Sequence, residues 1–196
     1  IKGIRKRRRT EMYDDIEKIL ITKAEIEEKV RALAAQLDAD YRDKNPLMLC
    51  ILKGSVLFFS DIVRNMKIKL EIDFMAISSY GAGTTSGIVR LVKDLDRSIE
   101  GRHVVIVEDI VDTGHTLAYL KRVLNQRRPA SVKICTLLDK FERREAEVDV
   151  DYKAFDIGNE FVVNIKDSSV LNVISVTELF FQAKSAAGTY LSLIHI

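Results

Sequence analysis

The residues with the clearest chemical potential lie between Val104 and Leu117. Four β-branched apolar residues open this stretch, and three acids follow within five positions: Glu108, Asp109 and Asp112. The run Thr113-Gly-His-Thr116 comes next, with leucines at helical spacing behind it. The pattern predicts a strand buried on both faces, an acidic loop and a helix start. The free N–H groups of a helix start suit a phosphate, whereas the acids suit sugar hydroxyls or Mg²⁺.

Two further loops have a composition that could serve a ligand. Lys53-Gly54-Ser55 follows an apolar strand at residues 47–52, and a glycine there lets backbone N–H groups approach an anion closely. Taken alone, an ordinary turn explains this tripeptide equally well. Residues 78–87 are small, polar and glycine-rich, which is typical of a mobile loop or a bare hairpin. Their glycine spacing does not match a dinucleotide-binding fingerprint.

The elements around these loops alternate between strand and helix. Thr22 and Glu25 predict a capping box at the start of an amphipathic helix over residues 23–43. A second helix is predicted over residues 56–66. Apolar runs predict strands at 47–52, 70–77, 104–107 and 131–138, with a returning arm at 88–94. This alternation favours a parallel sheet that binds its ligand beyond the carboxyl ends of the strands.

Composition places the chain among globular proteins. Its 196 residues are 47% hydrophobic and 31% charged, which fits one domain with a substantial core. No apolar run reaches the roughly 18 residues that span a bilayer, so we expect no membrane association. Cys50 and Cys135 lie in apolar runs and predict reduced core thiols, hence a cytoplasmic protein. The three histidines share no zinc-ligand spacing with them.

The first residues carry an unusual charge. Residues 1–11 contain six basic side chains and one acid, and without them the net charge falls from +2 to −3. Such a run fits a nucleic-acid-binding arm or a tail outside the fold. We favour the tail, with no nucleic acid as partner and a single domain over residues 12–196.

The motif between Val104 and Leu117 resembles, in register, the phosphoribosyl diphosphate (PRPP) signature of type I phosphoribosyltransferases. Its flanking residues are similar to the hypoxanthine(-guanine) branch of that family over about residues 13–163. An ordinary surface loop rich in Asp and Thr is the alternative. The resemblance implies an α/β fold, with a parallel sheet flanked by helices and a small C-terminal hood.

The resemblance also implies a role for each part of the motif. Glu108 and Asp109 would hold the ribose hydroxyls and Mg²⁺, and Asp112 would be the base that faces the purine. The 5′-phosphate would bind the turn, and the diphosphate would bind the loop after the first strand. The residues implied are Thr113, Gly114, His115 and Thr116 for the turn, and Lys53 and Gly54 for the loop.

Other implied site residues lie outside this motif. Ser79 and Tyr80 would belong to a lid that closes over the reacting centre, and Lys140 would recognise the 6-oxo group of the purine. Tyr152 would stack on the base, and the backbone of Lys153 would meet the purine edge. A second Mg²⁺ site would use Asn159, a weak ligand where the family has Asp.

The chain departs from the family pattern near its C-terminal end. Phe141 stands where proline usually follows the lysine, and Asn164–Ser169 replaces a Gly-Tyr-Gly-Leu-Asp-Tyr-like run. No arginine occurs after Arg144, although the family directs a late arginine at diphosphate. Residues 164–196 are therefore interpreted as divergent or foreign sequence.

The implied activity is Mg²⁺-dependent purine salvage. Phosphoribose would pass from PRPP to hypoxanthine or guanine, giving IMP or GMP and diphosphate, in a homodimer or homotetramer. Two alternatives remain open. One is a PRPP- or nucleotide-sensing regulator on the same fold, which needs the phosphate turn but neither the base nor the lid. The other is the enzyme fold made inactive by its altered C-terminal segment.

Overall fold

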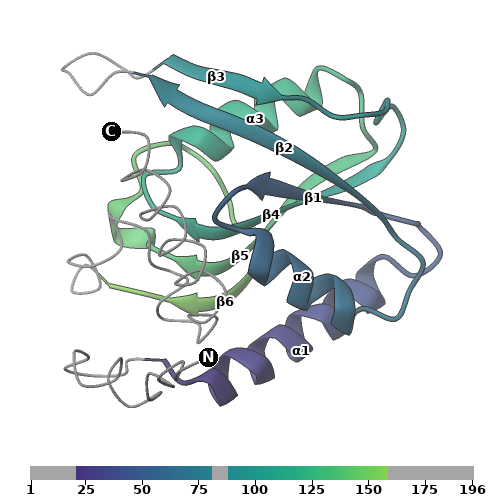
Figure 1. Ribbon diagram of the computed structural model, residues 1–196, viewed down its shortest axis with the longest axis vertical. Coiled ribbons are helices and arrows are strands. Elements are labelled where there is room, and N and C mark those ends of the chain that lie inside the picture. The colour runs from purple at the N-terminus through teal and green to yellow at the C-terminus, as the bar shows by residue number, and fades with distance from the viewer. Residues whose placement is uncertain (1–20, 81–87, 159–196) are drawn as a thin grey trace, which may run out of the picture.

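A six-stranded sheet forms the centre of the computed structural model, which describes residues 21–80 and 88–158 (Figure 1). The strand order is β3-β2-β1-β4-β5-β6, and all neighbours are parallel except β2 and β3. The strands are β1 (Leu47–Leu52), β2 (Glu71–Tyr80), β3 (Ile88–Lys93), β4 (His103–Val111), β5 (Ser131–Asp139) and β6 (Tyr152–Asp156). The helices are α1 (Lys23–Asp40), α2 (Val56–Asn65) and α3 (His115–Asn125), with a 3₁₀ turn, η2 (Phe141–Arg143).

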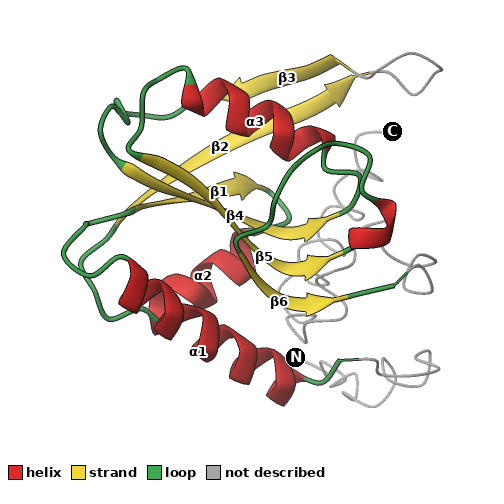
Figure 2. Ribbon diagram, turned by 180° about the vertical axis from the view of Figure 1, so that it is seen from behind, coloured by secondary structure: helices red, strands yellow, loops and turns green. Residues whose placement is uncertain are grey.

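Helices cover both faces of the sheet, as the resemblance implied. Helices α1 and α2 pack on one face and α3 packs on the other (Figure 2). Strand β1 divides its side chains between these two layers, because Met48 and Cys50 face α1 and α2 whereas Leu47, Leu49 and Ile51 face α3. Strands buried on both faces read as continuous apolar runs. This explains why the sequence located β1 at its observed bounds.

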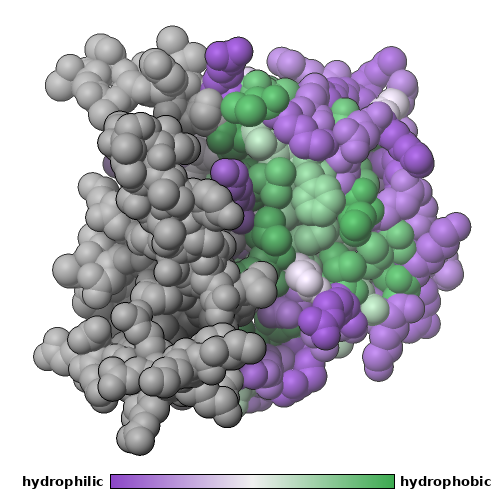
Figure 3. Space-filling model, in the orientation of Figure 1, coloured by the Kyte–Doolittle hydropathy of each residue, from purple (hydrophilic) through white to green (hydrophobic). Residues whose placement is uncertain are grey.

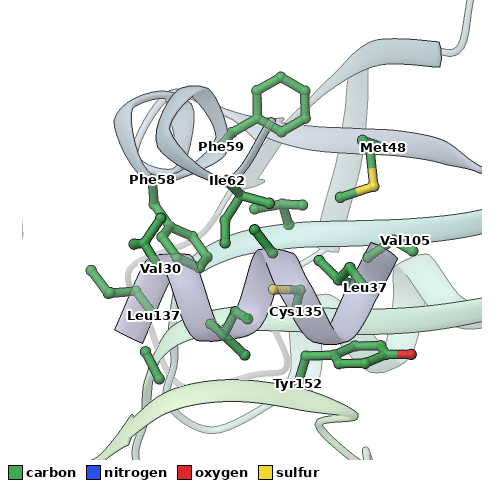
Figure 4. Packing of buried hydrophobic residues seen from close by; sticks show 14 of the residues in the cluster. Val30, Leu37, Met48, Phe58, Phe59, Ile62, Val105, Cys135, Leu137 and Tyr152 are labelled. Carbon is green, nitrogen blue, oxygen red and sulfur yellow. The ribbon is translucent and has the colours of Figure 1, made fainter. Parts of the chain in front are cut away.

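The core between the sheet and the first two helices is continuous. Figure 4 shows Val30 and Leu37 of α1 and Phe58 and Ile62 of α2 close to the sheet residue Cys135. Helix α1 begins with the predicted capping box: the Glu25 N–H donates to Thr22 Oγ1 at 3.3 Å, and the Thr22 N–H donates to Glu25 Oε2 at 2.7 Å.

Two strands are longer than the sequence predicted by two residues or more, and β5 is longer by one residue. Strand β4 continues past its apolar run to Val111, so Glu108 and Asp109 lie within it. Strand β2 continues to Tyr80 because its backbone pairs with the antiparallel β3 as far as Ile88. Helix α1 is shorter, since it ends at Asp40. The predicted basic tail, the lid residues 81–87 and the C-terminal hood lie outside the described residues.

Apolar surface remains on the face that carries α1 and α2. Figure 3 shows it over the middle of the molecule, bordered by hydrophilic residues. Ile72 of β2, whose register partner Met48 faces the same layer, is 51% exposed.

Among the described helices, none has the length and apolar character needed to cross a bilayer.

Candidate functional site

The predicted site residues gather at the carboxyl ends of three neighbouring strands. Strand β4 lies between β1 and β5 in the sheet. Lys53 and Gly54 follow β1, Glu108 and Asp109 lie near the end of β4, and Lys140 follows β5. Because parallel strands end at the same edge of a sheet, these residues meet there, as the α/β pattern predicted.

The loop after β1 lies directly against an acid of β4. A Cβ atom placed on Gly54 would overlap Asp109 Oδ2 and lie 3.1 Å from Asp109 Cγ. A side chain at residue 54 would therefore require the Asp109 carboxylate to shift. The peptide bond between Leu52 and Lys53, which leads into the loop, is cis. The structure thus brings the predicted diphosphate loop and the predicted ribose-binding acids together.

The two acids of β4 are held in an environment that disfavours their charge. Burial raises the pKa of Glu108 well above its ordinary value, and the neighbouring Asp109 carboxylate raises it further. Burial also raises the pKa of Asp109, although the Ile110 N–H, 2.8 Å from Asp109 Oδ1, partly offsets this. Glu108 Oε2 is buried and has no hydrogen-bond partner among the described residues.

This pair of carboxylates fits Mg²⁺. The ion prefers oxygen ligands and is held by one or two carboxylates together with water and substrate oxygens. A buried carboxylate oxygen that has no hydrogen-bond partner among the described residues, beside a second carboxylate, would fit such a partial shell. Within residues 21–80 and 88–158 no cluster of three or more metal-ligating side chains occurs. A Mg²⁺ ion bound here would therefore take its remaining ligands from water or from a substrate.

The turn after β4 has a geometry that requires glycine. Gly114 has φ +83° and starts α3, where the Ala118 N–H donates to the Gly114 carbonyl at 2.9 Å. A Cβ atom on Gly114 would lie 2.7 Å from Arg144 Cδ and 2.7 Å from Val148 Cγ1. The turn is therefore packed against the segment that follows β5, a contact that the sequence did not reveal.

Two polar side chains of the turn contact that same segment. His115 is exposed, and its Nε2 lies 2.9 Å from Glu145 Oε2, so the ring faces Glu145 at the surface. Asp112 Oδ2 lies 3.4 Å from Arg143 Nη1, whereas Asp112 Oδ1 is buried without a hydrogen-bond partner among the described side chains. Among the described residues, one carboxylate oxygen of the predicted base is thus without a partner.

The end of β5 carries two buried charged residues. Lys140 is 3% exposed, and its backbone N–H donates to the Val111 carbonyl at 2.9 Å, which ties it to β4. Asp139 is equally buried and accepts hydrogen bonds from Arg144 and from Lys153, the latter at 3.4 Å. Neither Asp139 nor Arg144 is among the site residues predicted from the sequence. The available signal was an acid at the end of a buried strand with arginines close behind it.

Tyr152 does not join this group, and its predicted role as a base-stacking residue does not fit its position. It pairs with Cys135, so it lies four residues, or about 13 Å, before the end of β5. Its ring packs against α1, where Figure 4 shows it beside Leu37, and its hydroxyl donates to Asp40 Oδ2 at 2.9 Å. Lys153 reaches the site edge through its ammonium, which contacts Asp139 and Asp156.

Three predicted residues have no described side chain. Ser79 and Tyr80 end β2, and their backbones pair with Val89 and Ile88. Their predicted lid continues into residues 81–87, which lie outside the described residues. Asn159, the predicted weak metal ligand, also lies outside them.

Comparisons with known proteins show which family the chain resembles. The profile of the phosphoribosyl transferase domain matches residues 17–171. The hypoxanthine-guanine phosphoribosyltransferase of Streptococcus thermophilus (strain CNRZ 1066) is 47% identical over 150 residues, 76% of this chain and 83% of the relative. The relative of Streptococcus agalactiae serotype V is 48% identical over 153 residues, 78% of this chain and 85% of its own length.

Solved structures give the same result. A hypoxanthine phosphoribosyltransferase of Staphylococcus aureus superposes with TM-score 0.73 at 40% identity and covers 77% of this chain and 83% of its own. The Trypanosoma cruzi hypoxanthine phosphoribosyl transferase, whose C-terminal region was studied for its role in oligomeric state and activity, superposes with TM-score 0.69 at 43% identity, covering 73% and 79%. The chain therefore belongs to the phosphoribosyltransferase family, in the group of hypoxanthine-guanine phosphoribosyltransferases.

Proposed function

We propose that this chain is a purine-salvage enzyme that transfers phosphoribose from PRPP to hypoxanthine or guanine and releases diphosphate. One observation carries the proposal: Gly54 packs on Asp109 at the strand end from which the 112–116 turn also departs. A diphosphate loop, two acids and a phosphate turn at one edge of the sheet would match the three parts of PRPP. Relatives at 47–48% identity carry the same activity in their names.

The acids of β4 bind the sugar in this proposal. Glu108 and Asp109 accept hydrogen bonds from the ribose hydroxyls, and they are also the residues that would hold Mg²⁺. The ion, when bound, would supply positive charge that lowers the cost of ionising both half-buried carboxylates and of forming diphosphate. Lys53 and the Gly54 N–H bind the diphosphate as it departs.

The turn and the strand end of β5 bind the remaining groups. The backbone N–H groups of residues 113–116 bind the 5′-phosphate at the start of α3. Asp112, whose Oδ2 lies 3.4 Å from Arg143 Nη1, removes a proton from the purine. Lys140 donates to the 6-oxo group, which favours a 6-oxopurine over a 6-aminopurine. Ser79 and Tyr80 exclude water from the reacting centre.

The assembly and location of the protein are part of the same proposal. We infer a homodimer or homotetramer that acts in the cytoplasm. In the Trypanosoma cruzi relative, the C-terminal region was examined for its role in oligomeric state. The oligomeric state of this chain should therefore be measured directly. Sedimentation of the purified chain gives its mass in solution, and a monomer would contradict this part.

The activity is tested by mixing the protein with PRPP and Mg²⁺, offering hypoxanthine, guanine, xanthine and adenine in turn, and measuring nucleotide formed. We expect IMP and GMP, and none from adenine. Asp109→Asn should remove turnover, whereas Asp43→Asn, in an exposed turn after α1, is the matched control that retains it. Binding of PRPP or IMP without any turnover would favour the nucleotide-sensing regulator or the inactive enzyme instead.

A further inference from the structure

Arg144 makes an unusual set of contacts for a residue outside the sheet. Its side chain is 11% exposed. Its Nη1 donates to the Val148 carbonyl at 2.7 Å, its Nε donates to the Asp112 carbonyl at 3.3 Å, and its Nη2 donates to Asp139 Oδ1. One guanidinium thus joins the end of β5, the segment after it and the turn that starts α3.

Each partner of Arg144 borders a residue with a proposed role. Asp139 directly precedes Lys140, which would select the purine. The carbonyl that accepts from Nε belongs to Asp112, the proposed base. The aliphatic part of the side chain packs on the 5′-phosphate turn, since a Cβ on Gly114 would lie 2.7 Å from Arg144 Cδ. Arg144 therefore contacts the base side and the phosphate side at once.

Backbone hydrogen bonds from the residues after Arg144 add to its contacts with the turn. The N–H groups of Glu145 and Ala146 both donate to the Thr113 carbonyl, at 2.9 and 3.0 Å. The segment 144–146 consequently holds two successive carbonyls of the turn, those of Asp112 and Thr113.

We propose that Arg144 is a positioning residue, which holds Lys140 and the 112–116 turn at the mutual distance that the transfer reaction requires. The proposal rests on the proposed function. Arg144 itself binds no substrate and acts through Asp139 and Asp112. A planar guanidinium that donates to three acceptors holds them in a nearly fixed arrangement. A displacement of a reacting group by 1 Å can lower the rate about 100-fold.

Arg144→Lys is the informative substitution. A lysine keeps a cation beside the buried Asp139, so it avoids leaving an uncompensated buried charge. It cannot reach three acceptors in one plane, because an ammonium is a single point on a flexible stem. The variant should fold and keep Asp139 paired, yet release the Asp112 carbonyl.

Arg127→Lys is the matched control. Arg127 also forms a bidentate pair, with its Nη1 and Nη2 2.7 and 2.9 Å from the two carboxylate oxygens of Asp94, beyond the end of α3. The Arg127→Lys variant also replaces a bidentate guanidinium by an ammonium, but Arg127 does not contact the site. We expect roughly 10- to 100-fold lower kcat for Arg144→Lys at saturating PRPP and hypoxanthine, and parental kcat for the control.

Amide hydrogen exchange gives a readout that does not depend on activity. In Arg144→Lys the Glu145 and Ala146 amides should exchange faster than in the parent, while β1 amides are unchanged. Should the parent prove inactive, the proposed function fails, and the exchange result still decides whether Arg144 holds the turn. Parental exchange at both amides, or a kcat loss that disappears on correction for the folded fraction, would overturn the proposal.

Discussion

Gly114→Ala tests the packing on which the phosphate turn depends. Gly114 has φ +83°, a backbone conformation that costs other L-residues roughly 1–2 kcal/mol. The added methyl would also lie 2.7 Å from Arg144 Cδ and from Val148 Cγ1. Arg144 has little room to withdraw, since three hydrogen bonds hold its guanidinium. Forcing a methyl into packed surroundings costs a further 1–3 kcal/mol or so.

Gly101→Ala separates the two costs. Gly101 has φ +70°, and a Cβ placed on it would meet nothing within 4 Å. The backbone penalty is therefore common to both variants, and the packing cost belongs to Gly114 alone. With roughly 2–4 °C of Tm per kcal/mol for a chain of this length, the Gly114 variant should melt about 2–12 °C below the Gly101 variant.

Thermal melts and IMP calorimetry measure the two consequences. We expect Gly101→Ala to bind IMP as the parent does, because its turn lies before β4 at the opposite end of that strand. Gly114→Ala should bind IMP more weakly, since the methyl displaces the turn or its support. Equal melting temperatures for the two variants, together with parental IMP affinity in both, would refute the packing argument.

Four further predictions concern the site. Asp112→Asn should bind IMP normally but lower kcat by roughly 10²–10⁴-fold, and unchanged turnover would remove Asp112 from the mechanism. Lys140→Gln should raise the KM for hypoxanthine with the circular-dichroism spectrum unchanged; a parent that uses adenine equally well would contradict its role. Because the pKa of Glu108 is raised in the folded state, the folded state loses stability as the pH rises above about 4.5. Glu108→Gln should therefore be more stable than the parent near neutral pH and equally stable in acid. Urea unfolding at several pH values would show this difference. We propose that Asn159 and the lack of an arginine after Arg144 weaken diphosphate binding, as the resemblance implied. Calorimetry at matched Mg²⁺ should then show IMP bound well but PRPP and diphosphate bound about 10- to 150-fold more weakly than by a relative that has the Asp and a late arginine, and equal PRPP affinity would refute this.

The sequence located most of the sheet, and its errors have a physical cause. Periodicity ends the β4 strand at Val107 because Glu108 and Asp109 interrupt the apolar run. In the structure, backbone pairing with β5 continues as far as Val111 opposite Asp139. Strand pairing depends on backbone groups rather than on side-chain polarity, so buried acids can lie within a strand where a site needs them.

The candidate site divides in the same way between local and long-range features. The acids and the turn at 104–117 are contiguous, so their chemistry is legible in the sequence. Their support comes from residues about 30 positions away: Arg144 holds the Asp112 carbonyl, and Glu145 holds the Thr113 carbonyl. A local sequence pattern does not predict such a contact, because it depends on β5 lying beside β4 in the sheet.

Tyr152 shows most clearly that residue type alone does not assign a role in the site. An aromatic residue near the end of the family match invites assignment to a purine pocket, but its side chain is directed by the register of β6. That register pairs Tyr152 with Cys135, and Cys135 faces α1 in the core. The hydroxyl is then satisfied by Asp40, 112 residues earlier. A buried tyrosine needs both an apolar surface for its ring and a partner for its hydroxyl, and α1 supplies both. Residue type alone therefore cannot distinguish a stacking aromatic from a core aromatic; the strand register decides between them.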